Sequence, residues 1–232
     1  MQNKRIKLWD LPTRLTHWLL FLAVAAAFAT GLIGGNLMVW HGRLGLAIIG
    51  LLAFRLIWGV VGSTYARFSQ FVRGPATIVA YLRGNWHGIG HNPLGALSVL
   101  ALLGLLLFQT LSGLVANDDI AFKGPLYALV SADTSAWLTG LHRQAIWLIG
   151  ILVALHIAAM LFYKFVHRDD LIRPMLTGYK DVTDPAVQSA SGGGILALLI
   201  ALGVAVLVVW IADGGLLPPP PPPPPPGSVP SW

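Results

Sequence analysis

The sequence predicts an all-α integral membrane protein, and three observations lead to this fold class. The 232 residues are 56% hydrophobic and only 10% charged, whereas soluble domains carry about 25% charged residues. Five long apolar runs follow one another along the chain, and the basic residues gather in alternate connections between these runs. The predicted architecture is a transmembrane bundle of four helices with a fifth transmembrane helix near the C-terminus.

Each apolar run predicts a helix, because about 20 helical residues are needed to cross the hydrocarbon core of a bilayer. A backbone in lipid must also pair its own amides, which a helix does. The first and last runs are slightly short, so we expect a thinner bilayer or interfacial flanking residues to help them. The predicted spans are 18–33, 44–61, 94–115, 145–166 and 195–211.

The basic residues outside the spans predict the orientation of the chain. Eleven of the fifteen Lys and Arg residues lie in the N-terminal tail and in the connections before the third and fifth spans, which share one side. The positive-inside rule then places the N-terminus in the cytoplasm and the C-terminus outside. The net charge of +6 therefore indicates topology and contact with anionic membrane lipids. No basic cluster favours a nucleic-acid partner.

Both ends of the chain admit a second interpretation. A basic stretch precedes the first run, and residues 27–29 are Ala-Phe-Ala, a pattern also found in cleaved signal peptides. Nine consecutive prolines at 218–226 predict a stiff polyproline II rod about 28 Å long. Such a rod is a spacer or a ligand for a partner's aromatic groove. We favour a retained first helix and a spacer.

Histidine is the main side chain left for metal or redox chemistry, because the chain has seven His and no Cys. The absence of Cys excludes disulfides, Cys-ligated iron–sulfur clusters and covalently attached haem. An ionisable side chain inside a membrane span is costly, so each His there is a candidate functional residue. His17 and His41 lie at the starts of the first two spans, and His142 and His156 belong to the fourth.

The spacing of His142 and His156 is the most informative pattern. Fourteen helical residues at about 100° each place both rings on one helix face, roughly 21 Å apart along the axis. His41 is expected at the depth of His142, and His17 at the depth of His156. Two membrane levels with two imidazoles each suit two haems with His on both axial positions, which favours electron transfer over oxygen chemistry.

Other interpretations of these histidines are a non-redox metal transporter with a His-lined path and a membrane anchor subunit. A lone His at a helix end is also often just interfacial and solvated. A transporter is expected to show acidic groups inside the membrane or broken helices, and the first four predicted spans contain no acidic residue. An anchor would have no use for paired histidines.

Several stretches resemble the bacterial cytochrome b561 and nickel–iron hydrogenase b-type cytochrome family. They include WDLPTRLTHWLL from Trp9, HGRLGL from His41 and LHRQAIWLIGILVALHIAAMLFY from Leu141. The resemblance covers about residues 7–180. It implies a di-haem cytochrome b domain over 1–180, followed by a linker with the fifth helix over 181–213 and a proline-rich outer tail over 214–232.

The resemblance also implies ligands, partners and a location. His17 and His156 would bind the cytoplasmic-side haem b, and His41 and His142 the outer one. Related subunits sit in the bacterial inner membrane and exchange electrons between quinone and a redox partner, such as a dehydrogenase, a hydrogenase or a c-type cytochrome. The resemblance leaves open whether the chain is an electron-transfer cytochrome alone or the membrane subunit of an oxidoreductase.

Weaker candidates lie near these histidines. Arg55 follows His41 by fourteen residues, so it shares that helix face near the inner haem. It would bind a haem propionate, or its side chain would extend to the interface. His91 and Asp10 are candidate proton acceptors for quinol oxidation, and His91 is also a candidate alternative ligand or plain interfacial residue. An acidic outer loop, Asp118 and Asp119, would attract a basic cytochrome c or be merely solvated.

Overall fold

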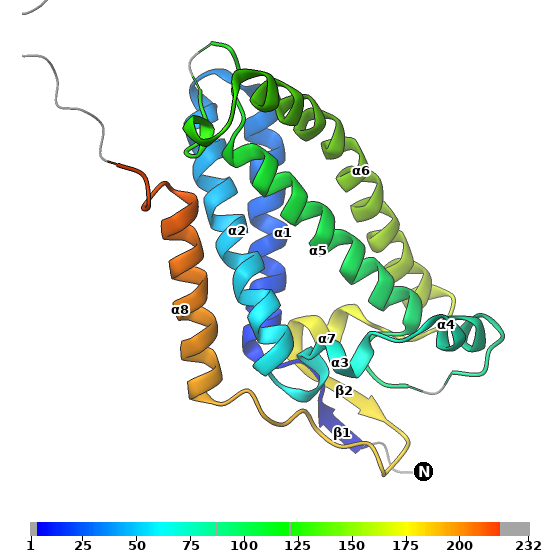
Figure 1. Ribbon diagram of the computed structural model, residues 1–232. Coiled ribbons are helices and arrows are strands. Elements are labelled where there is room, and N and C mark those ends of the chain that lie inside the picture. Colours follow the sequence, from blue (N-terminus) through cyan, green and yellow to red (C-terminus); the bar gives the residue numbers. More distant parts are fainter. Residues whose placement is uncertain (1–3, 87, 121, 219–232) are drawn as a thin grey trace, which may run out of the picture.

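The computed structural model describes residues 4–86, 88–120 and 122–218, and Figure 1 shows its architecture. Five helices in these ranges are long and apolar enough to cross a membrane. This confirms the predicted all-α membrane class with five transmembrane helices. They are α1 (Leu11–Ile33), α2 (Met38–Val61), α5 (Pro93–Leu114), α6 (Ala132–Phe165) and α8 (Ile195–Ala212).

The first helix begins earlier than its apolar run indicates. α1 begins at Leu11 rather than at residue 18 because Asp10 caps it. The Asp10 carboxylate accepts a hydrogen bond from the Thr13 amide at 2.7 Å, and such a bond satisfies one of the free amides of a first helical turn. With 23 residues, α1 is long enough to cross a bilayer, which corrects the expectation that it is short.

The fourth span is longer than predicted for the same reason. α6 begins at Ala132 rather than at residue 145, where the Ser131 hydroxyl accepts a hydrogen bond from the Thr134 amide at 3.2 Å. Its 34 residues correspond to a helix about 51 Å long. A hydrocarbon core of about 30 Å is shorter than this, so the polar first turns of α6 extend beyond the lipid or the helix is tilted.

α2 is the central helix of the bundle and packs against α1, α5 and α8. α6 packs against α5 and lies on the side of the bundle farthest from α8 (Figure 1). Leu20 of α1 and Leu52 of α2 belong to one buried cluster, against which Leu103 of α5 packs. Phe54 and Ala201 belong to a second cluster that joins α2 to α8. The fifth helix is therefore held to the other four through α2.

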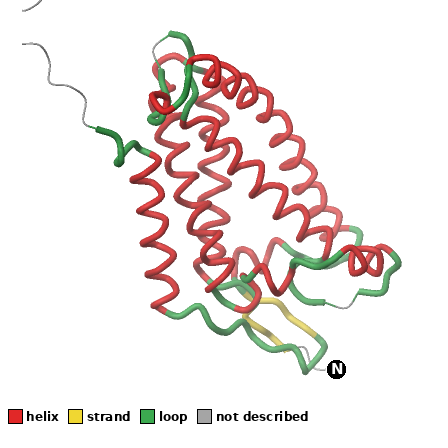
Figure 2. The backbone as a smooth tube through the Cα atoms, viewed as in Figure 1, coloured by secondary structure: helices red, strands yellow, loops and turns green. Residues whose placement is uncertain are grey.

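A two-stranded antiparallel sheet closes one end of the bundle. It pairs β1 (Lys4–Lys7) with β2 (Tyr179–Val182), drawn in yellow in Figure 2. The side chain of Ile6 is completely buried there. The sequence did not reveal this sheet, because four-residue strands far apart in the chain carry no local alternation signal. We call this end the sheet end, and the opposite end, with connections 34–37 and 115–131, the loop end.

Short helices complete the connections. They are η1 (Gly35–Leu37), η2 (Thr64–Ala66), α3 (Phe68–Phe71), α4 (Pro75–Leu82), η3 (Tyr127–Leu129) and α7 (Ile172–Thr177).

The segment between β2 and α8 is held against the sheet end. The Tyr65 hydroxyl donates a hydrogen bond to the Gln188 carbonyl at 2.7 Å, and the Ala190 amide donates one to the Lys7 carbonyl at 2.7 Å. The expected domain boundary after residue 180 falls within β2, and the division into three domains stays a prediction. The polyproline rod expected in the tail lies outside the described residues from position 219 onward.

Candidate functional site

The four histidines singled out in the sequence lie in two pairs, one at each end of the bundle. At the sheet end, the ring centroids of His17 on α1 and His156 on α6 are 6.4 Å apart. At the loop end, those of His41 on α2 and His142 on α6 are 6.0 Å apart. We call these the sheet-end pair and the loop-end pair. One face of α6 therefore contributes a histidine to both.

These separations fit two imidazoles on opposite sides of one metal ion. Rings that share an ion, with nitrogen–metal distances of about 2.0 Å, have centroids roughly 6.2 Å apart. No group of three or more His, Cys, Asp or Glu side chains suited to a metal ion occurs within the described ranges. Two imidazoles would leave the remaining ligand positions of an iron to another group, and a haem would supply such ligands.

The loop-end pair is held by backbone carbonyl groups. Nδ1 of His41 lies 2.9 Å from the Ala27 carbonyl oxygen, and Nδ1 of His142 lies 2.9 Å from that of Gln109. The Ser112 hydroxyl also lies close to this His142 nitrogen, at 3.2 Å. Because a carbonyl only accepts hydrogen bonds, both Nδ1 atoms carry the proton, and Nε2 keeps its lone pair for a metal.

Two glycines make room for the loop-end rings. A Cβ atom at Gly31 of α1 would lie 2.8 Å from Cε1 of His41, and one at Gly113 of α5 would lie 3.0 Å from Cε1 of His142. Sequence reasoning missed both residues. The signal for Gly31 was present, because it follows His17 by fourteen residues and so shares that face of α1.

The sheet-end pair is held less firmly. Nδ1 of His17 is buried without a hydrogen-bond partner in the described part of the chain. Nδ1 of His156 has only the Ser98 hydroxyl, at 3.5 Å. This contact is at the limit of a hydrogen bond. The two pairs therefore share a similar ring separation but differ in the hydrogen-bond partners of their Nδ1 atoms.

His91 is a buried imidazole close to the sheet-end pair. It packs between Trp9 and Phe71, with ring centroids 4.8 and 4.6 Å away, and its Nδ1 has no partner within the described residues. Burial, and then the positive charge of Arg55, lower the pKa of His91 to about 3. The ring is therefore neutral at physiological pH and a weak proton acceptor, which speaks against its expected role in quinol oxidation.

Arg55 lies inside the protein rather than at the interface. Only 7% of its surface is exposed, its Nη1 donates to the Ala66 carbonyl at 3.2 Å, and its guanidinium stacks over Phe68. Of the two roles considered for it, a buried cation that binds an anion fits this position better. The Nε atoms of Arg14 and Arg67 are also buried without a hydrogen-bond partner in the described structure, which the sequence did not indicate.

Asp10 has a structural role. One carboxylate oxygen accepts from the Thr13 amide at 2.7 Å, and the other accepts from the indole nitrogen of Trp58 at 2.9 Å. Asp10 is 7% exposed and Trp58 only 1%. Both oxygens of Asp10 therefore hold structural hydrogen bonds, and its expected role as a proton acceptor for quinol stays a prediction.

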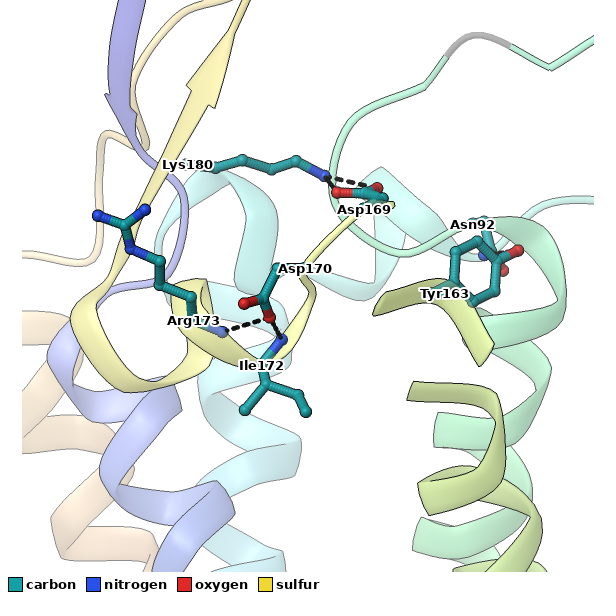
Figure 3. A network of polar contacts seen from close by, with 7 residues as sticks. All are labelled: Asn92, Tyr163, Asp169, Asp170, Ile172, Arg173 and Lys180. Carbon is teal, nitrogen blue, oxygen red and sulfur yellow. Dashed lines mark hydrogen bonds and ion pairs between the residues drawn. The ribbon is translucent and has the colours of Figure 1, made fainter. Parts of the chain in front are cut away.

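A polar network fixes the sheet-end terminus of α6, as Figure 3 shows. Nζ of Lys180 in β2 is 2.8 Å from the Asp169 carboxylate. The Asp170 carboxylate accepts hydrogen bonds from the Arg173 and Ile172 amides at 3.1 and 3.0 Å, and these bonds keep the pKa of Asp170 below its usual value. The network ties the chain after α6 to β2.

A second contact in Figure 3 joins α6 to α5. The Asn92 amide nitrogen donates to the Tyr163 hydroxyl at 2.8 Å, and the Tyr81 hydroxyl of α4 also contacts that hydroxyl. Asn92 is in addition the N-cap of α5. The sheet-end half of α6, which includes His156, is therefore positioned by α4, α5 and β2.

Comparisons with known proteins place this arrangement in a family. A family model described as prokaryotic cytochrome b561 matches residues 8–178. The probable Ni/Fe-hydrogenase 1 B-type cytochrome subunit of Escherichia coli (strain K12) is 24% identical over 215 residues, which cover 74% of this chain and 89% of that protein. The probable Ni/Fe-hydrogenase B-type cytochrome subunit of Azotobacter vinelandii is 24% identical over 222 residues, covering 77% and 90%.

No solved structure gives a significant match. The family model spans most of the chain and includes α1, α2, α5 and α6 with all four paired histidines, whereas α8 lies beyond it. Membership of a b-type cytochrome family implies haem b as the bound group, a multi-pass bacterial membrane protein and a role in electron transport. The chain belongs to the prokaryotic cytochrome b561 family.

Proposed function

We propose that this chain transfers electrons across the bacterial inner membrane through two haem b groups. The sheet-end pair, His17 and His156, would hold one haem, and the loop-end pair, His41 and His142, the other. The observation that carries the proposal is the centroid separation of 6.4 and 6.0 Å in the two pairs. Two unrelated His contacts would have no reason to share the spacing of ligands on one ion.

Haem, when bound, supplies a one-electron iron couple. The side chains around it would perform the other tasks. Neutral imidazoles bind iron without adding charge to a medium of low dielectric constant, and two of them fill both axial positions, so that no position is left for oxygen. Buried Arg55 would bind an anionic haem propionate, because a charged hydrogen-bond partner stabilises a cation this deeply buried.

The orientation follows from the basic residues. The sheet end carries Lys4, Arg5 and Lys7 of β1. The connection between α2 and α5 lies at the same end. By the positive-inside rule this end faces the cytoplasm, so the sheet-end haem would be the cytoplasmic-side one. The loop end and the C-terminus would then face the periplasm.

The reaction partners are proposed on similarity. The relatives are named as cytochrome subunits of Ni/Fe-hydrogenases, which supports a hydrogenase or a comparable dehydrogenase as the partner of this chain. A membrane quinone would be the second reactant, and a c-type cytochrome is the other candidate redox partner. The chain would then be the membrane subunit of an oxidoreductase, with substrate chemistry performed on the partner.

The direct test is the haem content of the purified full-length protein. We expect a dithionite-reduced minus oxidised spectrum of a b-type cytochrome, and a pyridine haemochrome assay that gives two haems b per chain. A folded, monodisperse protein without haem would refute the proposal, and one haem per chain would refute its di-haem part.

A further inference from the structure

We infer that α4 is an interfacial helix that binds the headgroups of anionic phospholipids at the sheet end of the bundle. The inference goes beyond electron transfer, because it concerns the contact of the chain with the membrane surface and not the histidine pairs. Three observations carry it: the level at which α4 lies, the apolar side that it exposes, and the arginines at both of its ends.

α4 lies beside the bundle at the level where two membrane spans end. It packs against α5, and its Tyr81 hydroxyl contacts the hydroxyl of Tyr163 in the last turns of α6. Because α5 begins at Pro93 and α6 ends at Phe165, the helix lies close to the sheet-end termini of both spans. Figure 1 shows α4 at the side of the bundle next to these termini. This is the level at which headgroups meet the hydrocarbon core.

The outer side of α4 is apolar. Val79 is 45% exposed and Leu82 is 66% exposed, and a spacing of three residues puts both on one side of the helix. Ile78 and Tyr81 have the same spacing and are partly buried, so they form the inner side. A short helix that exposes its apolar residues is poorly suited to water, but it suits the boundary between headgroups and acyl chains.

Two arginines flank α4 without a carboxylate to balance them. Arg73 precedes the helix and Arg83 follows it, and both are exposed. Neither makes an ion pair within the described ranges, and the chain has no acidic residue between Asp10 and Asp118. Guanidinium groups bind phosphate oxygens through paired hydrogen bonds, so both arginines suit the phosphate of a lipid headgroup.

The neighbouring end of α6 has the same composition. Phe165 and Val166 are exposed, and so is Arg168, whereas the two acidic residues that follow are each paired with a lysine. Trp86 packs edge-on against Tyr81 with ring centroids 5.9 Å apart, and tryptophan is enriched at membrane interfaces. Apolar, aromatic and positively charged side chains thus occur together at one level, which is typical of surfaces that bind anionic lipid.

Charge favours lipid over a second copy of the chain as the occupant of this surface. A symmetric dimer through α4 would bring the same arginines of two chains together, and like charges weaken an interface. The phosphates of anionic lipids complement the arginines instead. The surroundings of Val79 separate lipid from an acidic partner protein, because only lipid would surround this side chain with acyl chains.

The first test places a nitroxide label on Val79→Cys, which is the single Cys of that variant because the chain has none. The full-length holoprotein is reconstituted in nanodiscs of equal parts phosphatidylcholine and phosphatidylglycerol. We expect oxygen, which concentrates among acyl chains, to relax the label, and a water-soluble nickel chelate to have little effect. Ala186→Cys, exposed at the sheet end outside α4, is the control and should show the reverse. A label at position 79 that behaves like the control, or one protected from both reagents by a protein contact, would overturn the inference.

The second test removes the two charges in the double variant Arg73→Gln and Arg83→Gln. Added phosphatidylglycerol should raise the melting temperature of the wild type in detergent more than phosphatidylcholine does, and this difference should fall to less than half in the double variant. Arg5→Gln with Lys7→Gln, which removes two exposed charges of β1, is the matched control and should keep the difference. Each variant is compared with itself in two lipids, so a general loss of stability does not imitate the result. No preference for phosphatidylglycerol in the wild type, or an equal loss in both double variants, would overturn the headgroup site at α4.

Discussion

Gly31 of α1 lies directly against the imidazole of His41 on α2, so that a Cβ atom at position 31 would be 2.8 Å from Cε1 of the ring. Contacts this short do not occur between real side chains, and the ring or the helix would have to move. The same edge of the ring is fixed by the hydrogen bond from Nδ1 to the Ala27 carbonyl, and Nδ1 would lie 2.9 Å from that Cβ atom. Glycine at position 31 is therefore part of the geometry of the loop-end pair.

We expect Gly31→Ala to displace His41 and to lower the affinity of the loop-end haem at least tenfold, with the sheet-end haem retained. The substitution itself favours the helix by about 1 kcal/mol, and the melting temperature of the variant separates loss of haem from loss of folding. Gly104→Ala on α5 is the control, because nothing lies within 4 Å of a Cβ there. Haem content after dilution into apo-myoglobin, a haem acceptor, measures the effect. Equal haem retention in both variants would disprove the role of Gly31.

The stability of the protein should fall on acidification because of His91. Its pKa is about 3 in the folded chain and about 6.5 in an unfolded one. The folded state therefore keeps the ring neutral, and the stability that this provides is present above pH 6.5 and is lost as the pH falls below it. Between pH 7.5 and pH 5 the loss amounts to roughly 2 kcal/mol.

His91→Phe keeps a ring between Trp9 and Phe71 but removes the titration. We expect its melting temperature in detergent to depend less on pH than that of the wild type over this range. His167→Phe is the control, because His167 is exposed and should leave the pH dependence unchanged. The role of His91 would be excluded by parallel pH profiles for the wild type and His91→Phe.

The fifth helix should be dispensable for haem binding but not for stability. Ala201 of α8 is completely buried in the cluster with Phe54 and Trp58 of α2. Ala201→Leu would overfill this contact at a cost of about 1–3 kcal/mol. We expect a lower melting temperature with two haems still bound, since all four proposed ligands belong to α1, α2 and α6.

Leu199→Ala, at an exposed position of the same helix, should leave the melting temperature close to that of the wild type. Loss of a haem from Ala201→Leu at temperatures where it stays folded would show that α8 shapes a haem site, contrary to this expectation.

The fold could be predicted because lipid imposes simple requirements on a chain. Long apolar runs must be helices, and all five were found. The first residues of α1 and α6 were not predicted, because Asp10 and Ser131 cap helical turns that lie outside the apolar runs. The β1–β2 sheet pairs the segments that directly precede and follow the family match, and no local pattern in the sequence indicates such a pairing.

The candidate site, like the fold, was predicted only in part from the sequence. The helical period alone placed His142 and His156 on one face, and the depths of His17 and His41 gave their partners. The hydrogen-bond acceptors of the ring Nδ1 atoms were not predicted. Carbonyl oxygens such as that of Ala27 belong to the backbone and have no signature in the sequence. The burial of His91 depends on Trp9 and Phe71, which come from separate connections.

The pairing of the four histidines is tested most directly by the haem-to-protein ratio of the four single His→Ala variants, measured on folded protein after size-exclusion chromatography. We predict one haem per chain in each variant. His17→Ala and His156→Ala should lose the same haem and share one residual spectrum and potential, and His41→Ala and His142→Ala should share the other. Retention of both haems, loss of both, or a shared loss in His17→Ala and His41→Ala would contradict the two-site arrangement.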